Sequence, residues 1–178
     1  MKMFFSAVFG LILVFGASGS ASAQRAPQLA NHNSAGAFQA SVEQLLLTKL
    51  NSFRASKGLA RLIADSRFAG AARAHALDMA KRNTLGHNDA NGLDFGGRMQ
   101  KIQGGQMHLT TMGENAAMMY PVRSVSAVGN TLFNSWLNSP PHLANMQRAD
   151  FKRVATGVVY LGDKAYADQI FIGSPLAR

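Results

Sequence analysis

Apolar side chains recur every three or four residues in two long segments of the chain, the spacing that places them on one face of a helix. The first segment runs from about 41 to 57, where Lys57-Gly58 gives a basic last turn followed by a glycine exit. The second begins after Asp65, a favourable N-cap residue, and continues to about Arg82. The apolar positions are Val42, Leu45, Leu46, Leu50 and Phe53 in the first segment and Phe68, Ala71, Ala72 and Met79 in the second. Two amphipathic helices are therefore expected in the first half of the chain.

Two more helices are expected further along. A short one runs from about 94 to 103, where a pair of glycines breaks it. A longer one, from about 124 to 138, has an apolar face that ends at Trp136, the single tryptophan. Pro140-Pro141 stops that helix, because proline has no N–H and clashes with the preceding turn. His142 is therefore expected just past a helix end.

The last part of the chain changes to the pattern of strands. Two alternating apolar runs, 154–161 and 165–172, are separated by Gly162-Asp163-Lys164, which indicates a hairpin. A helical first two-thirds followed by an antiparallel pair predicts an α+β fold in which helices pack against a small sheet.

The N-terminus has the layout of a cleavable secretory signal. Lys2 gives it a basic start, Met3 to Phe15 form a largely apolar run, and small residues end at Ala21-Ser22-Ala23, so cleavage is expected before Gln24. The apolar run is shorter than the roughly 20 residues that span a bilayer, and no second run follows. We therefore expect a secreted or periplasmic protein without an integral membrane segment after cleavage of residues 1–23.

The mature chain is expected to form one domain behind a leader. Residues 24–40 lack a sustained apolar period and are interpreted as a flexible leader. Residues 41–178 form the expected domain, because the 155 residues that remain after cleavage suffice for one hydrophobic core. With no cysteine in the chain, stability must come from packing, which suits a bacterial exported protein.

The net positive charge and its distribution along the chain indicate which kinds of partner to expect. The formal net charge of +9 falls to +8 when Lys2 leaves with the signal, and it favours contact with anionic polymers or lipid head groups of the envelope. The basic residues are spread through the chain, and no run is interleaved with aromatic residues as a nucleic-acid platform requires. Nucleic acid is not an expected partner, and the protein is expected to be a monomer.

In addition to His142, two polar residues are candidates for a functional site. His87 precedes the turn-forming segment 88–92, so its ring nitrogens can face a cleft. Glu114 comes just before the apolar stretch 116–120, where a carboxylate needs a partner. Two interpretations of Glu114 stay open: it braces a buried turn, or it contacts a ligand.

The other histidines are weaker candidates. His75 lies on the apolar face of the second helix, where a satisfied core histidine is commoner than a ligand. His32 falls in the expected leader and has no fixed neighbours. His108 has two open placements, in the cleft or in solvent, and the polar residues around it favour solvent.

Four motifs in this order resemble the CAP superfamily, the cysteine-rich secretory, antigen 5 and pathogenesis-related proteins, in its bacterial SCP-like form. The resemblance covers about 42 to 174. Each motif is weak alone, but their order and spacing are specific. The motifs are Leu50–Ala55 with Gly58-Leu59, Ala71–Ala80 with Gly86-His87, Gly113-Glu114-Asn115, and Trp136–Asn145.

The resemblance implies an α-β-α sandwich, with helices around a small three- to four-stranded antiparallel sheet. It also implies a cleft with two histidines and acidic residues, which binds divalent metal in some members. The cleft positions carry over to His87, Glu114 and His142, with Asn115 and Asn145 in support. A second glutamate of eukaryotic members appears here as Ser139. Zinc or another divalent cation therefore has His87 and His142 as candidate ligands, and holding it with an open position would also need Glu114 to converge.

Three functions are carried forward. The leading one is a binding domain for a small molecule, lipid, peptide or other envelope component, because members of the superfamily are linked to lipid binding, defence and signalling without one shared reaction. The rival is a metal-dependent hydrolase in which Glu114 is the candidate catalytic base on a metal-bound water. No His-Glu-x-x-His helix or Gly-x-Ser-x-Gly elbow is present, so an enzyme is the less favoured interpretation. The third treats the polar cluster as purely structural.

Overall fold

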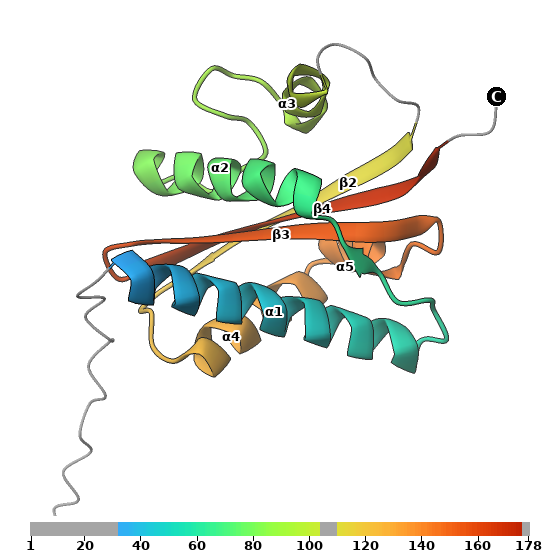
Figure 1. The fold of residues 1–178 in the computed structure, drawn as a ribbon, viewed down its shortest axis with the longest axis horizontal. Coiled ribbons are helices and arrows are strands. Elements are labelled where there is room, and N and C mark those ends of the chain that lie inside the picture. The colour runs from blue at the N-terminus through green and yellow to red at the C-terminus, as the bar shows by residue number, and fades with distance from the viewer. Residues whose placement is uncertain (1–31, 104–109, 176–178) are drawn as a thin grey trace, which may run out of the picture.

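The computed structural model describes residues 32–103 and 110–175. The helices have the bounds α1 (His32–Ser56), α2 (Ser66–Arg82), α3 (Phe95–Ile102), α4 (Val125–Leu137) and α5 (Pro140–Gln147). The strands have the bounds β1 (Ile63–Ala64), β2 (Thr110–Met119), β3 (Phe151–Leu161) and β4 (Lys164–Pro175). In Figure 1, α2 and α3 cover one face of the sheet, and α1, α4 and α5 cover the other. The predicted α-β-α sandwich of the α+β class is confirmed.

The strands of the described residues form a four-stranded sheet in the order β1-β3-β4-β2. The predicted hairpin joins β3 to β4, and Gly162 adopts a positive φ of 63° in its turn, where a side chain would be strained. The expectation of a purely antiparallel sheet is wrong, because β1 pairs in parallel with β3. β1 lies in the connection between α1 and α2, which are on opposite faces. The chain therefore passes the sheet edge between the two layers and pairs with β3 there.

The second predicted helix is confirmed with its caps. The Asp65 side chain accepts the Arg67 N–H before the first turn of α2, and Asn83 ends the helix in the left-handed conformation. Gly157 of β3 lets this helix approach the sheet closely. A Cβ there would lie 2.2 Å from the backbone nitrogen of Arg73, so any larger residue would push α2 away.

The predicted start of the first helix, at about 41, is wrong. α1 begins at His32, nine residues before the expected start at 41. Phe38 anchors this part of the helix, because its ring packs edge-on against Tyr160 of β3 with ring centroids 5.0 Å apart. The first residues of α1 are rich in alanine and polar residues, so their sequence has no apolar period from which a helix could be predicted. Residues 1–31, including the expected signal, lie outside the described residues.

A further helix was missed after Trp136. α4 ends at Leu137 as predicted, but Pro140 and Pro141 then begin α5, so His142 lies in a helical first turn and not in a loop. Proline suits the first positions of a helix because their N–H groups have no partner within the helix.

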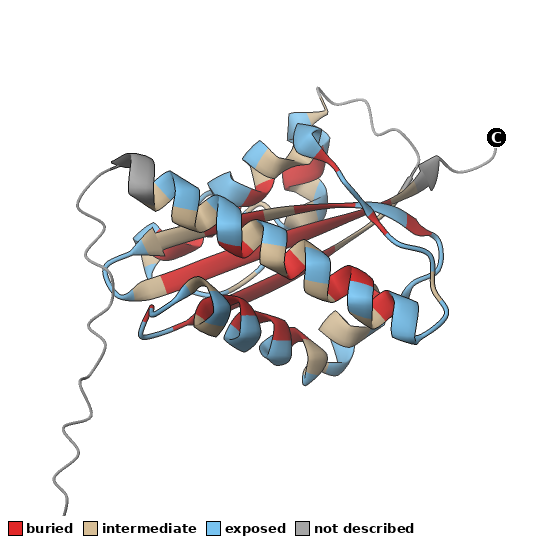
Figure 2. Ribbon diagram, turned by 60° about the horizontal axis from the view of Figure 1, so that its bottom comes forward, coloured by how far each residue is buried: buried red, intermediate tan, exposed pale blue. Residues whose placement is uncertain are grey.

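The main core lies between the sheet and the helices α1 and α4, as the buried segments in Figure 2 indicate. Leu46, Leu132 and Trp136 are fully buried there. On the opposite face, α2 packs over smaller clusters that include Met79, Tyr166 and Ile170. Within the described ranges, no helix is both long and apolar enough to cross a membrane.

Candidate functional site

Strand β2 carries the Gly113-Glu114-Asn115 motif. The expectation of a buried turn here is wrong, because Glu114 pairs with Ile170 of β4 and Asn115 with Gln169 in a regular antiparallel ladder. Successive side chains of a strand point to opposite faces. Glu114 therefore faces the α2 and α3 layer, while Asn115 faces the layer of α5.

The Glu114 carboxylate has two partners from two different elements. Arg98 of α3 donates to Oε1 through Nη2 at 2.5 Å, and His87 lies with Nδ1 2.7 Å from Oε2. The Glu114 side chain is 2% exposed and that of Arg98 8%, whereas the His87 side chain is 52% exposed. Arg98 also donates to the backbone carbonyl of His87 at 3.1 Å. The buried pair of Glu114 and Arg98 thus holds the exposed His87 at two points, its ring and its backbone carbonyl.

These contacts shift both ionisable groups of the dyad. Burial alone would raise the pKa of Glu114, but hydrogen bonds from His87 and Arg98 and the charge of Arg98 outweigh it and lower that pKa. The hydrogen bond to Glu114 raises the pKa of His87 against the smaller effect of its partial burial. A carboxylate at Nδ1 favours the proton on that nitrogen, which leaves Nε2 of the neutral ring free to accept a hydrogen bond or bind a cation.

On the other face of β2, two amides connect the strand to α5. Asn145 donates to the backbone carbonyl of Glu114 at 3.1 Å and to Oδ1 of Asn115 at 2.9 Å. Asn115 in turn donates to the carbonyl of His142 at 3.2 Å. The contact is so close that a Cβ at Gly113 would lie 2.9 Å from Oδ1 of Asn145. The glycine of the motif therefore makes room for the asparagine of the next motif.

The second histidine is brought to the first by α5. The rings of His87 and His142 meet edge to face with centroids 6.4 Å apart. Burial, and then the charge of His87, lower the pKa of His142. Its Nδ1 is buried and has no partner among the described residues. Ser139 is the N-cap residue of α5 but makes no capping bond with its side chain.

The three-ligand metal site that needed Glu114 does not fit this arrangement. Both oxygens of Glu114 are engaged, and among residues 32–103 and 110–175 no three His, Cys, Asp or Glu side chains are grouped to hold an ion. The two imidazoles are the remaining candidate ligands, and His87 has the carboxylate contact that orients many metal-binding histidines. A divalent cation would therefore be held by His87 and His142, with Glu114 behind His87.

A family comparison agrees with this order of motifs and with the fold. The model of the cysteine-rich secretory protein family, CAP, matches residues 47–173. The chain belongs to the CAP family. The match includes His87, Glu114 and His142, but it assigns no ligand to them.

Bacterial proteins are among those similar to this CAP domain. The membrane protein YlbC of Bacillus subtilis (strain 168) is 28% identical over 135 residues, which are 76% of this chain and 35% of that protein. The chain thus spans about a third of that relative. An extracellular SCP-domain protein of Bacillus anthracis superimposes with a TM-score of 0.68 and 24% identity, covering 81% of this chain and 44% of the other. An outer surface protein of Borrelia burgdorferi gives 0.63 and 18%, covering 76% and 93%. The two structures show the fold that this CAP domain shares.

Sequence reasoning missed Arg98, the cation that makes the buried Glu114 carboxylate tolerable. Arg98 looked like one of many scattered basic residues. Glu114 did signal the need for a partner, but α3 supplies it from 16 residues earlier in the chain. Only the packing of α3 over β2 in the CAP domain selects Arg98 from the other basic residues.

Two more ionisable residues of the CAP domain lie buried on the same face. His75 is 3% exposed, as expected for a core histidine, and its Nε2 lies 2.9 Å from the carbonyl of Gly86. Asp168 of β4 is fully buried, and neither carboxyl oxygen has a hydrogen-bond partner among the described residues. Its complete burial, and next the negative charge of Glu114, raise its pKa well above the usual value. His32 has no described side chain, and His108 lies outside the described residues.

Proposed function

We propose that this CAP protein works outside the cytoplasm as a binding protein, with His87 and His142 as the groups that contact its ligand. The observation that carries the proposal is the exposed His87 ring held by the buried Glu114 and Arg98 pair. Burying a charge pair has a large desolvation cost. Orienting a half-exposed ring adds little to the stability of the fold and so does not offset this cost. A binding site, in contrast, gains a ligand contact with a fixed orientation.

The ligand class we favour is an anionic component of the cell envelope, such as a lipid head group or an acidic peptide. The raised pKa of His87 favours its cationic form, and the net charge of the chain is strongly positive. A divalent cation held by His87 and His142 would replace the proton of His87 and would likewise leave positive charge on this surface. The secretory pattern of residues 1–23 and the extracellular or outer-surface names of two structural neighbours support this location.

The hydrolase alternative receives less support from the geometry. A general base must come within hydrogen-bond reach of the proton that it removes. The Glu114 side chain is 2% exposed, and its oxygens already accept from Arg98 and face His87. Glu114 is therefore better suited to orienting His87 than to activating water.

The test is a zinc titration followed through the histidine ring signals by NMR. We expect saturable binding that shifts His87 and His142 and is lost in the His87→Ala/His142→Ala double variant. The matched control is His32→Ala/His108→Ala, which removes two histidines that the proposal does not use as ligands and should bind zinc like the wild type. Anionic lipid vesicles are then added with and without zinc. Equal zinc and vesicle binding by the wild type and the first double variant would overturn the proposal.

A further inference from the structure

Strand β3 leaves one edge of the sheet largely unpaired. β1 pairs with it only at Arg153 and Val154, so beyond Val154 this edge of β3 has no neighbouring strand among the described residues. In Figure 1 the edge runs between α1 and α2, which cover opposite faces of the sheet. The candidate site of His87 and His142 is built around β2, the strand at the other edge. The two edges are therefore separate places for a ligand to bind.

Two hydrogen bonds show which backbone groups of β3 point outward. The carbonyl of Val154 accepts from the N–H of Asp65 at 2.9 Å, and the N–H of Val158 donates to Oε1 of Glu43 at 3.0 Å. The backbone groups of alternate residues in a strand point to the same side, so Thr156 also directs its N–H and C=O outward. Neither group has a partner in the described part of the chain. Unpaired edge groups of this kind are a template for another strand.

A cavity of about 260 Å³ opens beside Thr156. It is lined by α1, by the start of α2 and by β3, and each of these elements contributes an alanine: Ala40, Ala69 and Ala155. Small side chains leave space beside the strand that larger ones would fill. The unpaired backbone groups of Thr156 therefore face a space that a second chain can enter.

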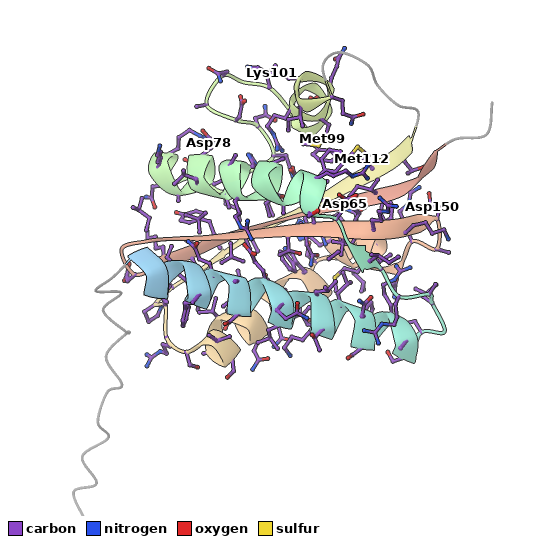
Figure 3. The ribbon with its side chains drawn as sticks, in the orientation of Figure 1. Asp65, Asp78, Met99, Lys101, Met112 and Asp150 are labelled. Atoms are coloured by element: carbon purple, nitrogen blue, oxygen red, sulfur yellow. The ribbon has the colours of Figure 1, made fainter. Side chains whose placement is uncertain are left out.

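The open part of the edge is limited at both ends. Asp65, labelled in Figure 3, lies beside Val154, where the chain passes from β1 into α2. At the other end, Glu43 of α1 pairs with Arg73 of α2 at 2.5 Å and caps the N–H of Val158. A strand covers about 13 Å from Val154 to Val158, so the open edge fits an extended segment of about three residues.

The exposed charge around this edge is positive. The two carboxylates, of Glu43 and Asp65, belong to side chains that are only 11% and 2% exposed. Their partners Arg67, Arg73 and Arg153 have side chains that are 64%, 48% and 50% exposed. Arg153 lies 3.6 Å from Asp65, whose two oxygens already accept from Arg67, so the charge of Arg153 is the least compensated. A partner with acidic side chains complements this surface.

The two sides of the edge differ in polarity. Arg67 and Arg73 belong to α2. Arg153 points toward the same layer, because it alternates along β3 in step with Gly157, which lies against α2. On the α1 side, Leu47 lines the cavity and packs against the main core. A segment paired with Thr156 therefore meets guanidinium groups on one face and apolar side chains on the other.

We propose that this edge of β3 binds a short extended peptide in which acidic side chains flank an apolar one. The central residue exchanges two backbone hydrogen bonds with Thr156, and its apolar side chain lies on the α1 side. The acidic side chains before and after it point toward Arg153 and the two arginines of α2. The proposal does not rest on the role of His87 and His142.

The probe is the capped tripeptide Ac-Glu-Val-Glu-NH2, added to the purified protein while the backbone amide signals are followed by NMR. We expect a saturable shift of the Thr156 amide signal and slower hydrogen exchange at that amide. Two analogues test the two kinds of contact. Methylating the amide nitrogen of the central valine removes the donor to Thr156 and should weaken binding about tenfold. Ac-Lys-Val-Lys-NH2 should not bind, because its charge is reversed.

Variants test the protein side. Arg153→Gln should weaken binding of the probe, whereas Arg123→Gln, which removes the same charge from an exposed position between β2 and α4, should not. His87→Ala/His142→Ala should bind the probe like the wild type, which separates this proposal from the role of the two histidines.

The proposal is overturned if the probe causes no shift at Thr156, if either analogue binds as well as the probe, or if the two arginine variants have equal affinity. Loss of probe binding in the histidine variant would also overturn it. Protection of the Thr156 amide that rises with protein concentration, without any probe, would mean that a second copy of the chain occupies the edge in place of a peptide.

Discussion

The two faces of β2 carry polar clusters of different kinds, from neighbouring residues of one strand. On the α3 side, Glu114 and Arg98 form a buried ion pair that holds the exposed His87. On the α5 side, Asn115 and Asn145 form a neutral amide pair that holds the backbone of His142. Neutral amides are sufficient to fix a helix to a strand. The charged cluster has the higher desolvation cost, and it alone sets the ionisation of an exposed ring.

The comparison is tested most strongly by breaking the ion pair. Arg98→Met should lower the free energy of unfolding by about 3 to 5 kcal/mol, because the Glu114 carboxylate then stays buried without its cation. Urea unfolding measures the change. The double variant Arg98→Met/Glu114→Gln removes the stranded charge and should recover most of the loss. A loss below about 1 kcal/mol in the single variant would show that the pair is solvated and belongs with surface ion pairs.

Breaking the neutral side should cost less. Asn145→Ala removes the donor to the carbonyl of Glu114 and to Oδ1 of Asn115, and it should lower the free energy of unfolding by about 2 kcal/mol. Gln147→Ala is the matched control, because Gln147 is an exposed amide of the same helix and should change stability little. The ring signals of His142 should move in the first variant and stay in the second. If Asn145→Ala destabilises more than Arg98→Met, the ranking of the two faces is reversed.

The smallest expected effect is a gain in stability on the charged face. Asp168→Val should raise the free energy of unfolding by about 1 to 2 kcal/mol at pH 7, because it removes a buried carboxyl without hydrogen-bond partners. Thermal unfolding measured from pH 4 to pH 8 in both proteins checks it.

The pH dependence of that gain has a definite sign. The folded-state pKa of Asp168 is raised, so its contribution to stability is fully present below the unfolded pKa and is lost as pH rises toward the folded pKa. The advantage of Asp168→Val should therefore grow from about pH 4 upward. An advantage that is constant with pH would mean that Asp168 is ionised in the folded protein.

Local signals were enough for the elements that depend on neighbouring residues. The N-cap Asp65 and the helical spacing of the apolar residues after it predicted α2. The turn at Gly162, between two runs of alternating apolar residues, predicted the β3–β4 hairpin. The family motifs likewise pointed to His87, Glu114 and His142, and the structure brings these three residues near one another. The helix and the hairpin depend on interactions between residues close together in the sequence. The three site residues were located because each belongs to a recognisable family motif.

The sequence by itself therefore determined the main helices, the hairpin and the three polar positions of the site. Tertiary structure decided the start of α1, which Phe38 anchors on Tyr160, and the pairing of β1 with β3. It also decided that Glu114 is bound by Arg98 and faces away from Asn115. These outcomes depend on contacts between distant segments, whose energies appear only when the sheet and both helical layers have come together.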